Sequence, residues 1–147
     1  MPLGRWLPVV GWAAFIFLFS TSTFGGEHTG SYLLPVIGWC FPGLSEAERQ
    51  LAHGVIRKTA HVIEYAILSV LWFRALRRGA WSFAAAQLLA IAAAGVYACS
   101  DEWHQTFVMN RTGALSDVAI DVAGASFAQA ALRGWSWITG RPPPIGA

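Results

Sequence analysis

The stretch SDEWHQTFVMNRTGALSDVAID, residues 100–121, decides how the rest of the chain is interpreted. It holds four of the chain's eight acidic residues, and apolar runs long enough to cross a bilayer lie on both sides of it. Ionisable side chains at membrane spans are costly to keep there, so they are a functional-site hypothesis by default. The alternative is an ordinary solvated hairpin loop between two helices.

The composition is not that of a soluble domain. Of the 147 residues, 55% are hydrophobic and 12% are charged, and the mean hydropathy is +0.47. Apolar runs of about 20 residues predict transmembrane helices. We therefore expect an all-α, polytopic membrane protein, a four-transmembrane-helix bundle that forms one domain over residues 1–147.

Apolar runs, and the glycine, proline and charged residues between them, define the four expected spans. The expected spans are residues 6–24, 55–74, 82–100 and 115–137. The segment 25–43, between the first two spans, is rich in glycine, proline and aromatic residues. We expect it to be a loop that is too short and too broken to span, either an interfacial or re-entrant segment or a loop packed on the bundle.

Two further local signals concern the second span and the cysteines. Ser45 and Glu48 fit the S-x-x-E capping box, so a helix is expected to begin there and to continue to about Leu76. The two cysteines, Cys40 and Cys99, lack CxxC or metal-ligand spacing, and we interpret them as small apolar residues, leaving open whether they pair.

The basic residues predict the orientation in the membrane. With the N-terminus inside, six of the ten basic residues lie on the cytoplasmic side and four on the other. Short cytoplasmic segments enriched in lysine and arginine set the orientation of membrane helices. Both termini are therefore expected in the cytoplasm, and the polar stretch is expected outside. The cytoplasmic set is Arg5, Arg74, Arg77, Arg78, Arg133 and Arg141.

A second polar set, RKTAHVIEY, occupies residues 57–65 in the outer half of the second span. On a helix Lys58, His61 and Tyr65 share one face. A lone histidine there would most simply be a satisfied core residue. Five polar or ionisable residues within nine positions instead favour a site that faces the bundle interior.

Residues 100–121 can supply the other half of that site. Asp101 and Gln105 are four positions apart at the end of the third span, as are Asp117 and Asp121 at the start of the fourth. Ser116 or Asp117 could serve as an N-cap, but Asp121 lies one turn too deep for that role. A buried carboxylate needs a partner. The available cations are Arg57, Lys58 and Arg111. A structural ion-pair network that only holds the bundle together is the alternative.

The two polar sets match a known family. The patterns R-K-x-x-H-x-x-E-Y and D-E-x-x-Q-x-F, with R-x-x-x-x-x-D and a glycine downstream, resemble the VanZ-like family of small bacterial membrane proteins over roughly residues 5–135. The chain departs from the family at Asp121, where asparagine is usual. The matching positions are Arg57, Lys58, His61, Glu64, Tyr65, Asp101, Glu102, Gln105, Phe107, Arg111, Asp117 and Gly124.

The resemblance implies a bacterial inner-membrane protein with a cell-envelope role, because the namesake of the family is associated with resistance to the glycopeptide teicoplanin. It does not supply a reaction. Whether the chain is an enzyme stays open, since it has no HExxH, GxSxG or phosphatase-type motif.

Three functions fit the residues. The first is an intramembrane enzyme acting on an envelope lipid or lipid-linked precursor. The second is a non-enzymatic protein that binds and shields a headgroup, a precursor or a glycopeptide antibiotic. The third is a small transporter or partner subunit, which four spans would build only as an oligomer. The basic residues form no stripe, so nucleic-acid binding has no support.

The residue chemistry suggests roles within the site. Arginine and lysine suit a phosphate or carboxylate, and histidine suits acid–base work near neutral pH. A divalent cation is a candidate cofactor, since hard cations bind several oxygen ligands. The candidate metal ligands are Asp101, Glu102 and Asp117. The candidate catalytic residues are His61, Glu102, Asp101 and Asp117. The candidate binding residues are Arg57, Lys58, Tyr65, Gln105, Arg111, Asp121 and Glu64.

Overall fold

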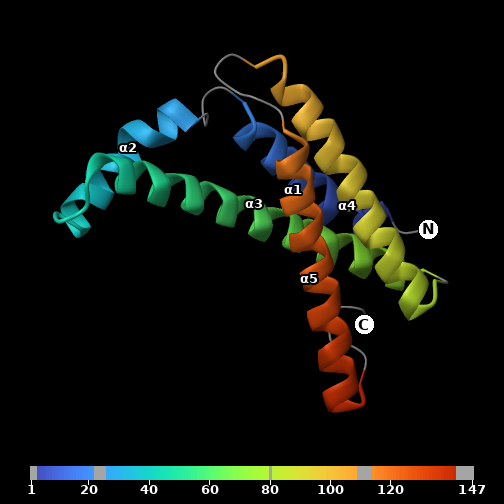
Figure 1. Ribbon diagram of the computed structural model, residues 1–147. Coiled ribbons are helices and arrows are strands. Elements are labelled where there is room, and N and C mark those ends of the chain that lie inside the picture. Colours follow the sequence, from blue (N-terminus) through green and yellow to red (C-terminus); the bar gives the residue numbers. More distant parts are fainter. Residues whose placement is uncertain (1–2, 22–25, 80, 109–113, 142–147) are drawn as a thin grey trace.

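The computed structural model describes residues 3–21, 26–79, 81–108 and 114–141, and in these residues all regular structure is helical (Figure 1). An all-α fold is therefore confirmed. A single 3-10 turn, η1, precedes five α-helices. The elements are η1 (Leu3–Arg5), α1 (Leu7–Phe19), α2 (Gly26–Cys40), α3 (Glu46–Arg77), α4 (Phe83–Gln105) and α5 (Leu115–Thr139).

The long helix α3 crosses α1 and α5 in the view of Figure 1, and it carries the polar set of residues 57–65. Its start is fixed by the expected capping box: the Ser45 hydroxyl accepts from the Glu48 backbone N–H, and the Glu48 carboxylate accepts from the Ser45 backbone N–H. These bonds satisfy donors that a helix N-terminus leaves without partners. The helix then continues to Arg77, as the sequence predicts.

Helices α3 and α5 run in the same direction, and paired contacts fix their register. Lys58 meets Asp117, and His61 meets Asp121. Further along both helices, Gln129 donates to the backbone oxygen and hydroxyl of Ser69. Because each step along α3 is matched by a similar step along α5, the polar residues of the two helices lie at the same level.

The helices approach closely where small residues line their contacts. On α4 four alanines at four-residue spacing are fully buried: Ala86, Ala90, Ala94 and Ala98. On α5 a Cβ atom at Gly124 would lie only 2.5 Å from the Val62 backbone oxygen of α3. Such small residues allow close packing of membrane helices. The small residues of the third and fourth expected spans thus allow α4 and α5 to pack closely against neighbouring helices.

Among the described residues, three helices are long and apolar enough to cross a membrane, α3, α4 and α5, which indicates a membrane-embedded protein. The first expected span, residues 6–24, contains the helix Leu7–Phe19, and residues 22–25 lie outside the described part. At about 1.5 Å per residue this helix is about 20 Å long, shorter than a hydrocarbon core of about 30 Å. It packs on the bundle through Val9 and Ile16, which are buried.

The expected loop at residues 25–43 is wrong in its local structure, because residues 26–40 form the helix α2. The glycines and Pro35 do not prevent this, since α2 packs antiparallel along the first half of α3. Thr29 Oγ1 lies 3.2 Å from Nε2 of the buried His53, and Gly38 lies against the Arg49 guanidinium. Packing against α3 thus outweighs the weak local helix propensity.

Candidate functional site

His61 of α3 and Asp121 of α5 form the centre of the polar site. His61 Nδ1 lies 3.3 Å from Asp121 Oδ1, and the Asp121 side chain is 0% exposed. Neither atom makes a well-directed hydrogen bond to any described residue, so the contact is an ion pair when His61 is protonated. The sequence predicts a lysine or arginine partner for Asp121. Among the described residues histidine takes this place, because Asp121 lies one turn deeper than Asp117, at the level of His61.

The outer rim of the site is the pair of Lys58 and Asp117. Lys58 Nζ lies 3.7 Å from Asp117 Oδ1, and their side chains are 60% and 34% exposed. An ion pair at this exposure contributes little to stability, about 0–1 kcal/mol. Lys58 therefore keeps a charge that is accessible from outside the bundle.

Asp101 joins the end of α1 to the end of α4. Its Oδ2 accepts hydrogen bonds from the Ser20 hydroxyl at 2.8 Å and from Gln105 Nε2 at 3.0 Å, and all three side chains are buried. Its Oδ1 is also buried and has no hydrogen-bond partner among the described residues. Ser20 is not among the site residues predicted from the sequence. The hydroxyl-rich end of the first apolar run is the signal that could have identified it.

Glu102 replaces the N-cap that the sequence predicts at Ser116 or Asp117. The N-cap position of α5 is Ala114, which has no side-chain cap. Glu102 Oε2 accepts from the Ala114 backbone N–H at 2.9 Å, although the two residues belong to different helices. A carboxylate at a helix N-terminus is favourable because of the unsatisfied N–H groups and the helix dipole. Glu102 is 5% exposed, which excludes the solvated-loop alternative for this residue.

Tyr65 lies one turn deeper than His61 and is fully buried. Its hydroxyl has no hydrogen-bond partner among the described residues. Its ring centroid is 6.4 Å from that of Tyr97, whose own hydroxyl donates to the Ala13 backbone oxygen. A buried hydroxyl without a partner is unusual, so Tyr65 offers a donor to the interior of the site.

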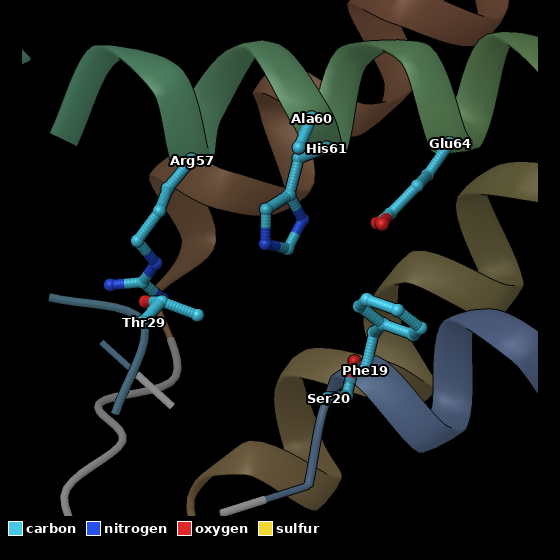
Figure 2. Close-up of a pocket in the computed structure, with 7 residues that line it drawn as sticks. All are labelled: Phe19, Ser20, Thr29, Arg57, Ala60, His61 and Glu64. Carbon is cyan, nitrogen blue, oxygen red and sulfur yellow. The ribbon is translucent and has the colours of Figure 1, made fainter. Parts of the chain in front are cut away.

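Two small cavities open beside this cluster, and Arg57 and His61 line both. In the first, of about 110 Å³, Arg57 extends from α3 toward Thr29 of α2, and Glu64 extends toward Phe19 at the end of α1 (Figure 2). The second, of about 100 Å³, includes Lys58 and Asp117. The cavities therefore combine cationic groups, carboxylates and an imidazole at one end of the bundle.

The site thus contains nearly all of the residues predicted from the sequence. Of the α3 set, Arg57, Lys58, His61 and Glu64 line the cavities, and Tyr65 is buried one turn deeper. Asp117 and Asp121 contact Lys58 and His61, and Glu102 lies close to His61. Arg111 lies outside the described residues, so its predicted role is neither supported nor opposed. The described residues brought together are Arg57, Lys58, His61, Glu64, Tyr65, Asp101, Glu102, Gln105, Asp117 and Asp121.

One group within the site has the composition of a metal-ligand set. His61, Glu102 and Asp121 each offer a ligand atom, and these atoms all lie within 4.8 Å of one another. The metal-ligand set predicted from the sequence is Asp101, Glu102 and Asp117. Only Glu102 is common to both sets, because Asp101 is engaged by Ser20 and Asp117 lies at the rim.

A second buried polar network lies nearer the other end of the bundle, and the sequence analysis missed it. Gln87 Nε2 donates to the Gln129 backbone oxygen at 2.7 Å, and Arg133 donates to Gln87 Oε1 at 3.2 Å. Gln129 in turn donates to Ser69. Single glutamines in apolar helices were the available signal. The network is built from neutral groups plus one cation, so we interpret it as structural.

The comparisons with known proteins agree with these motifs. The family model VanZ/LLP1 matches residues 5–135, which is most of the chain. Neither the search of curated proteins nor the search of solved structures found a match. The matched range includes both polar sets, the helices α3 and α4, and most of α5. The chain therefore belongs to the VanZ/LLP1 family.

Proposed function

We propose that this membrane protein binds the anionic headgroup of an envelope lipid or lipid-linked cell-wall precursor in the cavities beside His61. The observation that carries the proposal is that Arg57 lines both cavities while Lys58 stands at the rim with 60% of its side chain exposed. Guanidinium and ammonium groups are the usual partners of phosphate. A ligand that reaches such a site at the outer end of membrane helices is most simply a lipid headgroup.

The proposal includes an orientation with both termini in the cytoplasm and the site facing outward. At the end of the bundle opposite the site, the Arg5 side chain lies beside Gly79 in the basic turn between α3 and α4. This places the N-terminal arginine with the other basic residues, as the positive-inside rule favours. In this arrangement the span predicted over residues 6–24, which contains α1, adds to the three long helices to make four, and α2 lies in the interface. Tyr32 and Trp39 of α2 are 75% and 85% exposed, which suits a headgroup layer.

A second candidate function is chemistry on the bound headgroup, and the His61–Asp121 pair favours it. A carboxylate beside Nδ1 orients an imidazole and stabilises its protonated form. In a site without a bound metal, His61 would then accept a proton through Nε2 from a water or a substrate hydroxyl. Hydrolysis or transfer at the headgroup is the reaction class that these groups could support.

The binding experiment uses the full chain in nanodiscs with three lipids: an anionic phospholipid, a polyprenyl phosphate and zwitterionic phosphatidylcholine. Native mass spectrometry measures bound lipid, and product analysis by mass spectrometry measures turnover. We expect preference for the phosphate monoester or anionic headgroup. Charge-assisted hydrogen bonds contribute about 1.5–3 kcal/mol, so Arg57→Gln should weaken binding by about 10- to 100-fold.

The matched control is Arg141→Gln, which removes an exposed arginine at the other end of the bundle. Equal binding by Arg57→Gln and the wild type would contradict the proposal. Saturable binding without a product from any lipid would leave binding as the function and exclude chemistry on that panel. Teicoplanin, the ligand class suggested by the family resemblance, is tested as the alternative occupant.

Reporter fusions test the orientation. Four spans place both termini on the same side of the membrane, whereas three spans place them on opposite sides. We expect reporters fused before residue 3 and after Arg141 both to be active only in the cytoplasm. Activity of either fusion outside would contradict the orientation.

A further inference from the structure

Buried negative charge at the centre of the bundle exceeds the positive charge that faces it. Asp101, Glu102 and Asp121 are 3%, 5% and 0% exposed. Within the described residues, the only basic nitrogen at ion-pair distance from any of the three is that of His61. Ionised carboxylates in an apolar interior are strongly unfavourable unless they are paired or coordinate a metal. A bound cation would compensate this buried negative charge.

Several ligand atoms at this point are buried and have no hydrogen-bond partner in the part of the chain that the structure describes. These atoms are both carboxylate oxygens of Asp121 and Nδ1 of His61. The hydroxyl of Tyr65, one turn deeper, is also buried without a hydrogen-bond partner among the described residues. Glu102 uses Oε2 to accept from the Ala114 N–H. Buried polar atoms without partners are rare in folded proteins and mark catalytic groups or sites of an unassigned water or ion.

The separation of the ligand atoms fits a single ion. The atoms of His61, Glu102 and Asp121 lie within 4.8 Å of one another. In a four-coordinate site with bonds of about 2.1 Å, ligand atoms are roughly 3.4 Å apart. Side-chain rotations that move each atom by about an ångström would close that difference. The three residues come from three helices, so one ion would join α3, α4 and α5.

We propose that His61, Glu102 and Asp121 bind one divalent transition-metal ion, with Zn²⁺ preferred, and leave a coordination position facing the cavities lined by Arg57 and His61. The donor set selects this class of metal, because imidazole suits zinc and its neighbours whereas Mg²⁺ and Ca²⁺ prefer oxygen ligands alone. Three protein ligands with an open position are typical of catalytic zinc. The open position would accept a phosphate oxygen of the headgroup, a role that rests on the proposed function.

Asp101 and Tyr65 are buried near the proposed ligands but are not among them. Asp101 is held by Ser20 and Gln105, and Tyr65 lies one turn from His61 on the same helix. Groups that orient metal ligands typically change metal affinity by about 10- to 100-fold when they are removed. Tyr65→Phe should therefore weaken Zn²⁺ binding less than loss of a ligand does.

The experiment measures metal binding without added lipid. The full chain in detergent is stripped with a chelator and titrated with Zn²⁺, Mn²⁺ or Mg²⁺, and elemental analysis gives the stoichiometry. We expect one Zn²⁺ per chain, weaker Mn²⁺ binding and no stoichiometric Mg²⁺. Asp121→Asn should weaken Zn²⁺ binding by more than about 100-fold, beyond the range for supporting groups. The control Asp117→Asn, one turn away at the rim, should bind like the wild type.

A second readout keeps the test decisive if a variant folds poorly. Zn²⁺ bound to the native wild type should raise its melting temperature in proportion to the logarithm of the metal concentration. Absence of both stoichiometric binding and this shift would overturn the proposal. Equal Zn²⁺ affinity of folded Asp121→Asn and Asp117→Asn would also overturn it. Lipid binding by the stripped protein is measured separately, so failure of the metal site and failure of the headgroup site are distinguishable.

Discussion

The contact between Gly124 and Val62 predicts that alanine cannot replace this glycine without separating α3 from α5. A Cβ at position 124 would lie 2.5 Å from the Val62 backbone oxygen and 3.0 Å from its Cα. The first distance is 0.9 Å less than the 3.4 Å at which ordinary contact begins. Both obstructing atoms belong to a helix backbone, which cannot rotate away as a side chain can.

The expected cost follows from this overlap. Overpacking of a well-packed contact costs typically about 1–3 kcal/mol. Alanine offsets part of it, because it is favoured over glycine within a helix by about 0.8–1.0 kcal/mol. The useful comparison is therefore Gly134→Ala on the same helix, where a Cβ would meet nothing within 4 Å. Gly124→Ala should be less stable than Gly134→Ala by about 1–3 kcal/mol.

The substitution should also affect the site, because Val62 follows His61 and Gly124 lies one turn from Asp121. Separation of the helices would lengthen the 3.3 Å contact between His61 and Asp121. Thermal unfolding in detergent and Zn²⁺ titration measure the two effects. If Gly124→Ala unfolds at the same temperature as Gly134→Ala and binds Zn²⁺ equally, the close packing inferred here is refuted.

Three other substitutions test separate parts of the fold. Ser20→Ala removes one donor from the buried carboxylate of Asp101 and should lower the free energy of unfolding by about 1.5–3 kcal/mol. The control Thr21→Ala loses only a hydrogen bond within its own turn and should lower it less. Equal losses in thermal unfolding would contradict this prediction. Gln129→Ala removes two bonds to Ser69 and should destabilise the protein by about 1–3 kcal/mol, and an unchanged melting temperature would argue against a structural network. Lys58→Gln should change the free energy of unfolding by less than about 1 kcal/mol. It should weaken headgroup binding and make that binding less dependent on salt. A large loss of stability would show a structural role instead.

The two halves of the site could be predicted from the sequence because their signals are local. Helical spacing placed Lys58, His61 and Tyr65 on one face, and Asp117 and Asp121 one turn apart. What spacing could not show is which residues pair between helices. The partner of Asp121 proved to be His61 rather than an arginine or lysine of the described chain, because the register between α3 and α5 decides the pairing.

The N-terminus of α5 shows the same limit. The sequence offers Ser116 and Asp117 as local caps, yet the N–H of Ala114 donates to Glu102 on another helix. The helix α2 is a related case, because its glycines and Pro35 weaken a helix that packing on α3 then stabilises. Local patterns report what a segment favours alone, whereas burial against a neighbour can reverse that preference.

The sequence by itself determined the membrane class, the start and length of α3, and the two polar sets. These follow from the number of apolar residues, from capping chemistry and from helical periodicity, which act within about 20 residues of chain. Only the tertiary structure decided that His61, Glu102 and Asp121 converge and that Asp101 accepts a hydrogen bond from Ser20. The physical reason is that helix register is set by backbone contact at small residues such as Gly124, which no single helix encodes.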